Sequence, residues 1–188
     1  MYNRISIIGG SGTGKSTLTD ILSKELNIPA IHIDAINYEP NWKKIDKIER
    51  DKIILSKINE KKWIIDGNYT KTLQARLNKS DLIIWLDYST SAQLKGVFKR
   101  YLTMYKKERP EIPGCKERFN IEFIKNVASH NKKKRPILKS ILKNISEEKI
   151  LIFKKQKDLN NWLIEFTHND TILSDIKNKR PFHNINNI

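Results

Sequence analysis

The chain has a single cysteine and few glycines and prolines, and each scarcity excludes a class of protein. Cys115 has no partner for an intramolecular disulfide, and no CxxC spacing of a thiol-redox or zinc site surrounds it. With 7 Gly and 6 Pro among 188 residues, collagen-like and disulfide-scaffold chains are excluded. We therefore expect one compact domain in a reducing compartment, long enough to bury a core without disulfides.

Long apolar runs are also missing. A bilayer span takes roughly 20 apolar residues, whereas one of the longest runs here, Leu82–Leu86, has only the length of a strand. The chain begins Met1-Tyr2-Asn3-Arg4 and then enters an apolar run, without the basic, apolar and cleavage regions of a secretory leader. We expect a soluble cytoplasmic protein that has no membrane partner.

Positive charge is in excess, and it is concentrated in one segment. The net charge is +15, from 36 basic and 21 acidic side chains. Residues 91–157 hold 19 of the basic side chains and only 6 of the acidic ones. Such an imbalance is typical of proteins with acidic partners such as nucleotides or nucleic acid. The alternative is that lysine is simply the ordinary surface residue of a chain rich in Lys, Ile and Asn.

Short apolar runs alternate with helical spacings along the chain. The expected strands are Arg4–Ile8, Ala30–Ile33, Trp63–Ile65, Leu82–Leu86 and Lys149–Phe153. Apolar residues at helical spacing lie between the first two strands, around Leu18 and Leu22, and again from Ile45 to Ile58. This alternation is typical of a parallel sheet covered on both faces. The sequence therefore predicts a three-layer α/β fold with a five-stranded parallel sheet.

The clearest helix follows the fourth strand and leads into a turn-rich break. Apolar residues from Leu94 to Tyr105 repeat at i, i+3, i+4 and i+7, and Ser89, Thr90 or Ser91 can cap them. The stretch Glu108–Gly114 contains two prolines and a glycine, so a loop or lid begins there.

Further helical spacings follow the break. They are expected at 121–128 and 137–145, split by Lys132-Lys133-Lys134-Arg135-Pro136, and at Leu159–Phe166. We expect one domain over residues 1–167 that includes a basic, helical lid at about 100–135. The Asn-rich residues 168–188 are expected to form a loosely packed C-terminal tail.

A phosphate-binding motif stands directly after the first expected strand. It reads Gly9-Gly10-Ser11-Gly12-Thr13-Gly14-Lys15-Ser16-Thr17 and contains the Walker A pattern GxxxxGK[ST]. Glycines allow successive backbone N–H groups to face the phosphates, and the helix N-terminus adds a positive dipole. Lys15 can reach the β- and γ-phosphates, and the Ser16 hydroxyl can bind Mg²⁺. The motif predicts ATP and Mg²⁺ as cofactors, a mere flexible turn being the alternative.

Three aspartates stand at or just beyond expected strand ends, the edge where open α/β sheets bind ligands. Asp34 would point near the γ-phosphate and orient an acceptor hydroxyl or hold a metal-bound water. Asp66 would serve the metal, together with Ser16. Asp87 resembles a Walker B carboxylate and ranks third. The alternative for each one is a helix cap or turn residue.

Phosphoryl transfer also needs cations that arrive with the substrate. Arg100, on the polar side of the clearest helix, and Arg109, at the start of the break, are spaced as a hinged lid would require. Arg118 is a weaker candidate, and Arg76 could contact an anionic acceptor. The alternative is a solvated surface arginine in each case.

The remaining candidates carry less signal. The four histidines have no partners at metal-ligand spacing, so structural or surface roles are expected for them. Trp42 stands where an acceptor pocket would be built, and either stacking on a planar substrate or core packing would suit it.

Several of these motifs together resemble the adenylate-kinase-like small P-loop kinases, most closely the subgroup called DNA topology modulation proteins. The resemblance covers about residues 4–167. It rests on the Walker A loop, on His32-Ile33-Asp34 with Pro40-Asn41-Trp42, on Trp63-Ile64-Ile65-Asp66-Gly67-Asn68-Tyr69, and on Arg100-Tyr101 before Arg109-Pro110. It implies a P-loop NTPase fold like that of nucleoside-monophosphate kinases, with ATP and Mg²⁺ at the loop and arginines on a mobile lid. Adenylate kinases continue the Asp-Gly pair with Phe-Pro-Arg, whose arginine grips the nucleoside monophosphate, where Asn68-Tyr69-Thr70 stands here.

The function expected from the sequence is transfer of the γ-phosphate of ATP to a small acceptor, nucleotide- or nucleoside-like. Lys15, Asp34, Arg100 and Arg109 would be the catalytic residues, and Ser16 with Asp66 would organise the metal. Two alternatives stay open: an ATP-binding, DNA-associated regulatory protein that uses residues 91–157, and an ATPase without an acceptor. The sequence contains no recognisable DNA-reading motif.

Overall fold

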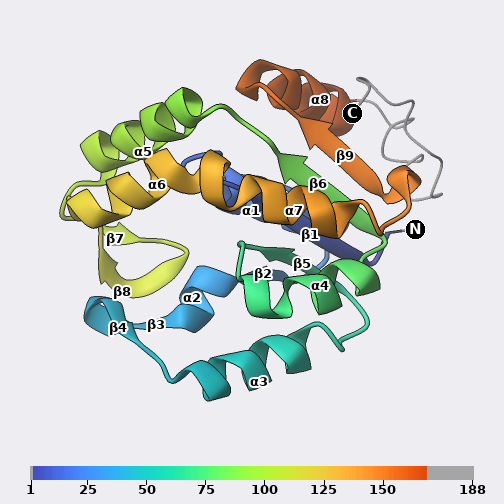
Figure 1. Ribbon diagram of the computed structural model, residues 1–188, viewed down its shortest axis with the longest axis horizontal. Helices are drawn as coiled ribbons and strands as arrows, with labels where there is room; N and C mark the ends of the chain where they lie inside the picture. Colours follow the sequence, from blue (N-terminus) through green and yellow to red (C-terminus); the bar gives the residue numbers. More distant parts are fainter. Residues whose placement is uncertain (1, 169–188) are drawn as a thin grey trace.

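A computed structural model describes residues 2–168, and its centre is a five-stranded sheet (Figure 1). The strands are β1 (Arg4–Gly9), β2 (Ala30–His32), β5 (Trp63–Asp66), β6 (Leu82–Leu86) and β9 (Ile150–Phe153). They run in the order β2-β5-β1-β6-β9, and every neighbouring pair is parallel. The prediction of a five-stranded parallel sheet is therefore confirmed.

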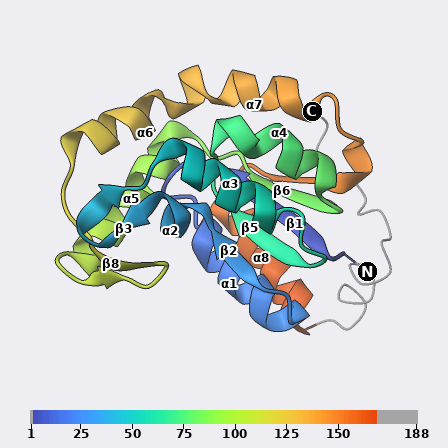
Figure 2. The ribbon, with the colours of Figure 1, turned by 90° about the horizontal axis from the view of Figure 1, so that it is seen from below.

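Helices cover both faces of this sheet, which makes three layers (Figure 2). Helices α1 (Lys15–Leu26) and α8 (Gln156–His168) lie on one face, and α3 (Lys47–Lys57), α4 (Thr70–Lys79) and α7 (Arg135–Leu142) lie on the other. Side chains of a strand point alternately to the two faces. On β6, Ile84 and Leu86 accordingly join the core under α1 and α8, whereas Ile83 and Trp85 pack under α4 and α7.

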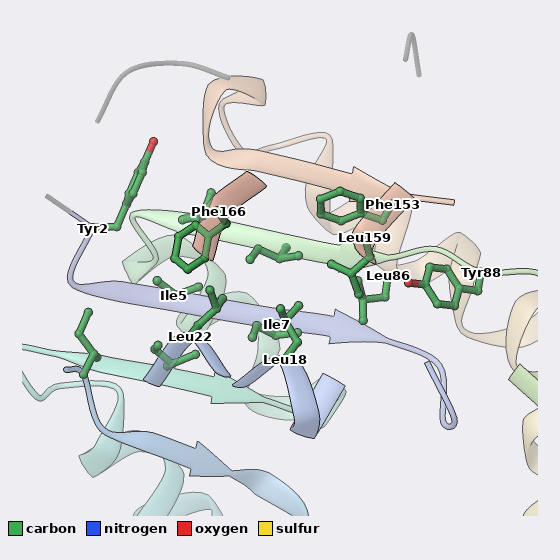
Figure 3. Close-up of a cluster of buried hydrophobic side chains, with 14 residues drawn as sticks. Tyr2, Ile5, Ile7, Leu18, Leu22, Leu86, Tyr88, Phe153, Leu159 and Phe166 are labelled. Atoms are coloured by element: carbon green, nitrogen blue, oxygen red, sulfur yellow. The ribbon is translucent and has the colours of Figure 1, made fainter. Parts of the chain in front are cut away.

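Between the sheet and helices α1 and α8, apolar side chains of the strands pack directly against apolar side chains of the helices (Figure 3). Ile5 and Ile7 of β1 meet Leu18 and Leu22 of α1, and all four side chains are at most 1% exposed. Burial of such side chains is the main favourable term in folding. This core fixes the start of α1, and with it the loop between β1 and α1.

Helix ends follow their local capping residues. Asp46 caps α3 by accepting hydrogen bonds from the backbone N–H groups of Ile48 and Glu49. Ser89 caps α5 (Thr90–Met104), and Asn120 caps α6 (Ile121–Lys133), each through its side-chain oxygen. Helix α1 ends at Leu26, and the next residue, Asn27, adopts the left-handed conformation with φ 51° shortly before Pro29.

Two small hairpins flank the edge of the sheet where the strands end. The first consists of β3 (Tyr38–Glu39) and β4 (Lys43–Lys44) around the short 3-10 helix Pro40–Trp42, and it follows α2 (Ile33–Asn37). The second, formed by β7 (Glu108–Arg109) and β8 (Ile112–Lys116), connects α5 to α6. We call residues 105–120 the lid hairpin. It packs against residues 38–42, so the two hairpins meet across that edge (Figure 1).

Several boundaries differ from the sequence-based expectation. Strand β2 ends at His32, because Ile33 already begins α2, and β9 begins at Ile150, because Lys149 ends the 3-10 helix Glu147–Lys149. The sequence did not predict either hairpin. The break between α6 and α7 falls within the expected basic run. The expected tail, apart from His168, lies outside the described residues.

The apolar stripe of α5 is only partly buried, contrary to what its spacing suggests. Val97 packs inward, but Phe98, Leu102 and Tyr105 are exposed to solvent. In the described part of the chain, no helix is both long enough and apolar enough to cross a bilayer.

Candidate phosphate-transfer site

The loop between β1 and α1 has the shape of an anion cradle. Gly12 and Gly14 adopt φ values of 78° and 88°, a region that side chains strain to enter. Thr13 donates its hydroxyl to the Gly10 carbonyl at 2.9 Å, and Lys15 Nζ donates to the same carbonyl at 2.8 Å. The loop leads directly into the N-terminus of α1. Backbone N–H groups in such a turn are suited to bind phosphate.

Four charged groups lie within electrostatic reach of Lys15. Burial lowers the pKa of Lys15, and the positive charges of Arg100 and Arg109 lower it further, while Asp66 and Asp34 act in the opposite direction. The folded chain thus brings Asp34, Asp66, Arg100 and Arg109 to the neighbourhood of one amine. All of these residues were singled out from the sequence.

Asp66, the last residue of β5, is buried and hydrogen-bonded. Its Oδ2 lies 3.1 Å from His32 Nδ1, and the nearby Ser16 side chain helps to lower the pKa of Asp66. Burial alone would raise the pKa of Asp66, but the bond from His32 and the charges of His32 and Lys15 lower it below its usual range. His32, expected to be a structural residue, in turn reaches Asp20 at 3.1 Å.

The oxygen atoms of Ser16 and Asp66 fit a hard cation. Mg²⁺ is usually held by one or two protein oxygens together with phosphate oxygens and water. Within residues 2–168, no group of three or more His, Cys, Asp or Glu side chains could hold a metal by itself. The pair therefore suits a magnesium ion whose other ligands are phosphate oxygens and water.

The other two aspartates take different positions. Asp34 lies in the first turn of α2, one residue beyond the start of that helix, and its side chain is exposed. Asp87 follows β6 and is buried in a two-fold contact with Arg135, whose Nε and Nη2 donate to its two oxygens at 2.7 and 2.5 Å. The Asp87 carboxylate is therefore bound by an arginine of α7, an ion pair that the sequence did not suggest.

Arg100 of α5 and Arg109 of β7 are both paired with carboxylates of the lid hairpin. Glu117 Oε2 lies 2.9 Å from Arg100 Nε and 3.9 Å from Arg109 Nε, and Glu111 Oε1 lies 2.5 Å from Arg109 Nη2. Arg109 and Glu117 are both buried. Burial would raise the pKa of Glu111, but the charge of Arg109 lowers it. Burial and the like charge of Arg109 lower the pKa of Arg100.

Trp42 joins the two hairpins. Its indole N–H donates to the Lys116 carbonyl at 2.8 Å, and the guanidinium groups of Arg109 and Arg118 lie 5.6 and 5.8 Å from its ring centre. Both distances are within the range of a cation–π contact. The buried Cys115 thiol also accepts the Trp42 backbone N–H at 3.3 Å. Trp42 thus holds the lid hairpin, a third role beside the two expected from the sequence.

Arg76 is buried and hydrogen-bonded to the backbone of the loop that follows β5. It is 1% exposed, and its Nη2 donates to the Gly67 carbonyl at 2.6 Å. Its Nε and Nη1 have no hydrogen-bond partner among residues 2–168. Burial lowers the pKa of Arg76 to about 10, so the guanidinium stays protonated at neutral pH. In this conformation Arg76 is enclosed by protein rather than open to an acceptor.

Two polar side chains that the sequence did not single out contact the cradle directly. Asn68 accepts the Gly9 N–H at 3.1 Å and donates to the Gly9 carbonyl. Gln93 on α5 lies so close to Gly10 that a Cβ added there would be 1.8 Å from its Oε1. Gly96 of the same helix approaches the loop equally closely, because a Cβ there would lie 2.0 Å from the Gly12 carbonyl oxygen. These contacts join residues far apart in sequence, which a motif search does not reveal.

Comparison with known proteins connects this architecture to small kinases. No protein-family model and no curated protein matches the chain. Among solved structures, the shikimate kinase from Acinetobacter baumannii in complex with shikimate is similar with a TM-score of 0.55 at 17% identity, covering 92% of this chain and 94% of that chain. The shikimate kinase from Bacteroides thetaiotaomicron gives a TM-score of 0.53 at 15% identity, covering 82% and 86%. The chain thus has the fold of small P-loop kinases, and its resemblance to the DNA topology modulation subgroup stays a prediction.

Proposed function

We propose that the protein is a phosphotransferase that moves the γ-phosphate of ATP to a hydroxyl group of a small acceptor. The observation that carries this proposal is the convergence of Asp34, Asp66, Arg100 and Arg109 on the electrostatic environment of Lys15, at the N-terminus of α1. An anion cradle alone would suit any nucleotide-binding protein. An arginine of α5 and an arginine of the lid hairpin, in the same electrostatic environment as two carboxylates, suit the transfer of a phosphoryl group.

The proposed roles follow from the positions of the residues. Loop N–H groups and Lys15 hold the β- and γ-phosphates, after Lys15 exchanges the Gly10 carbonyl for phosphate oxygens. Ser16 and Asp66 would hold Mg²⁺, which supplies neutralisation of phosphate charge when bound. Asp34, exposed on α2, orients the acceptor hydroxyl and accepts its proton as the new O–P bond forms and ADP leaves. Arg100 and Arg109 neutralise charge on the transferred group.

The acceptor site lies where the first hairpin and the lid hairpin meet. The segment that follows Asp66 offers little to a nucleoside monophosphate, because Asn68 is bonded to Gly9 and Arg76 is enclosed below Gly67. Since one of the similar kinases is bound to shikimate, hydroxylated carboxylic acids belong in the search for the acceptor, next to nucleosides and nucleotides.

The test is ADP release from ATP and Mg²⁺ against a panel of shikimate, other hydroxylated metabolites, nucleosides and nucleotides. We expect one class to stimulate turnover in the wild type. Lys15→Ala should abolish the stimulation, whereas Lys24→Ala, an exposed lysine of the same helix, should retain it. Nucleotide binding without stimulation by any acceptor would contradict the proposal.

A second candidate function is nucleic-acid binding by residues 91–157, with ATP as a switch. The observation that favours it is the exposed face of α5 and its surroundings, where Phe98, Tyr105 and Phe119 stand among lysines such as Lys95 and Lys99. Aromatic rings within a cationic surface suit single-stranded nucleic acid. Binding of this kind should weaken steeply as salt is raised, whereas stimulation by an acceptor should depend on the identity of the acceptor.

A further inference from the structure

A chain of polar side chains surrounds Gly9 and Gly10, the first two glycines of the loop at residues 9–17, which we call the phosphate loop. It begins at Asn68, whose amide contacts both the N–H and the carbonyl of Gly9. Asn68 Nδ2 lies 3.4 Å from His130 Nε2, and His130 Nδ1 lies 3.3 Å from Asn131 Oδ1. The chain thus passes from the loop after β5 to the C-terminal half of α6.

From α6 the chain continues to α5 and returns to the loop. Gln93 Nε2 donates to Asn131 Oδ1 at 2.8 Å, and both side chains donate to the Tyr88 carbonyl, at 2.9 and 3.0 Å. Gln93 is 1% exposed, and its Oε1 lies against Gly10 with no hydrogen-bond partner in the described part of the chain. A buried acceptor without a donor calls for a functional or structural reason.

The two helices that supply these side chains are those that enter and leave the lid hairpin. Helix α5 ends at Met104 and α6 begins at Ile121, with the lid hairpin between them. The two helices pack side by side (Figure 1). A movement of the lid hairpin that shifts either helix is therefore transmitted to Gly9 and Gly10 through Gln93, Asn131 and His130.

We propose that Gln93, His130 and Asn131 are positioning residues that couple the lid hairpin to the phosphate loop, so that nucleotide binding and lid rearrangement favour each other. This inference rests on the proposed function, because it assigns these residues to the nucleotide site of the same kinase. They act through backbone groups of the loop and touch no reacting atom. Coupling between two sites is reciprocal, so a break in the chain should weaken both events.

The test uses Asn131→Ala, with Asn126→Ala as the matched control on an exposed position of α6. Calorimetry measures the affinity for ATP with Mg²⁺. A second readout follows Trp42 in protein labelled with 5-fluorotryptophan, because the Trp42 ring lies under Arg109 and reports the lid hairpin. The ¹⁹F resonance of Trp42 is assigned with Trp42→Phe.

We expect Asn131→Ala to raise the Kd for ATP by about tenfold, within the usual range of coupling between sites, and to reduce the ATP-induced shift of the Trp42 resonance. Asn126→Ala should behave as the wild type. If Asn131→Ala melts earlier but binds ATP and shifts Trp42 as the wild type does, the residue only joins α5 to α6, and the inference is overturned.

A second pair of variants covers the case in which Asn131→Ala does not fold. His130→Ala should weaken ATP binding, and His130→Gln, which keeps a polar group toward Asn68, should restore most of it. Equal behaviour of the two variants would overturn the inference. These readouts need no turnover, so a wild type that binds ATP without phosphorylating any acceptor refutes the proposed function while the coupling remains measurable. A wild type that does not bind ATP would overturn both.

Discussion

The phosphate loop and the lid hairpin both provide positive charge, but they stabilise it in opposite ways. The loop presents backbone N–H groups in fixed positions, and its lysine is bonded to a carbonyl of the loop itself. The lid hairpin contains Arg109 and lies beside Arg100 of α5, and each of these arginines is paired with a carboxylate of the hairpin. Backbone dipoles carry only partial charge, whereas a buried guanidinium without a counter-charge is strongly destabilising.

The difference teaches how each region can respond to an anion. Phosphate entering the loop meets donors that need little rearrangement. Phosphate approaching the lid hairpin must compete with Glu111 and Glu117 for Arg109 and Arg100. In the proposed function the loop is therefore the stable binding element, whereas Arg100 and Arg109 change partners.

The largest effect on stability and ATP affinity is expected from Gly12→Ala, a substitution in the phosphate loop. Residue 12 has φ 78°, and a Cβ there would lie 2.4 Å from the Gln93 carbonyl oxygen and 2.7 Å from the Val97 nitrogen. A residue with a Cβ is strained in this left-handed backbone conformation, and the added methyl group overpacks the contact with α5. Together these two effects should lower the free energy of unfolding by about 3 kcal/mol. Urea denaturation and calorimetry with ATP would measure the losses of stability and affinity. Ser11→Ala is the control, and a Gly12→Ala variant as stable as that control would contradict the comparison.

The second prediction is that Trp42→Leu loosens the lid hairpin. The substitution removes the indole hydrogen bond to Lys116 and both contacts with arginines. A loss of about 1–2 kcal/mol of local stability is expected, and trypsin should cleave at Lys106, Lys107 and Lys116 about tenfold faster.

Trp42→Phe is the matched control, because it keeps a ring under the arginines and loses only the hydrogen bond. Its cleavage rate should lie between those of the wild type and Trp42→Leu. Cleavage of Trp42→Leu at the rate of the wild type would show that other contacts hold the lid hairpin.

The third prediction concerns the Glu117 carboxylate, with which phosphate would compete for Arg100 and Arg109. In Glu117→Gln the negative charge between Arg100 and Arg109 is lost, while the size of the side chain is kept. Because Arg109 keeps Glu111 and the Arg100 side chain is 25% exposed, the free energy of unfolding should fall by only about 1 kcal/mol. The Kd for ATP should nevertheless decrease by a few-fold, because the arginines are freed. Glu122→Gln, at an exposed site on α6, serves as control. A weaker affinity for ATP would show that Glu117 aligns the arginines rather than competing for them.

The smallest effect concerns pH. Burial lowers the pKa of His130 below 6.5, its ordinary value, and the charges of Lys134 and Lys15 lower it further, against the hydrogen bond that His130 donates to Asn131 Oδ1 and the charge of Asp87. The unfolded chain therefore binds a proton at a higher pH than the folded chain. This contribution to stability is complete above pH 6.5 and decreases as the pH falls below it.

Comparing the melting temperatures of the wild type and His130→Gln between pH 7.5 and 5.5 isolates the contribution of His130 to stability, because both proteins contain all the other titratable groups. His32 works in the opposite direction, because burial lowers its pKa but Asp66 and Asp20 raise it above 6.5 overall. An identical pH dependence of the two proteins would exclude a contribution from His130.

The same contrast explains how far the sequence alone could lead. The phosphate loop is a local structure, so Gly9 to Thr17 revealed it directly, and the strands that precede Asp66 and Asp87 were evident from their apolar runs. The partners of the lid arginines could not be predicted in this way. Arg100 and Glu117 lie on either side of β7 and β8 in the sequence, and Arg135 lies 48 residues from Asp87.

Solvent exposure was equally hard to predict from a pattern. The apolar spacing on α5 is correct for a helix, but it does not tell which residues face the core and which face solvent. Phe98 and Leu102 belong to the same stripe as Val97, and only Val97 is covered. Residues distant in sequence decide which side chains of α5 are shielded from solvent. The periodicity of α5 contains no information about those distant residues.

The contact between α5 and the phosphate loop limits how this protein can change over generations. The backbones at Gly12 and Gly96 approach without any side chain between them. A mutation at either position pushes the helix away from the loop, and a second mutation at the other position cannot compensate because it adds further bulk. Gly12 and Gly96 therefore constrain each other, because neither position accepts a side chain while α5 keeps its place against the loop.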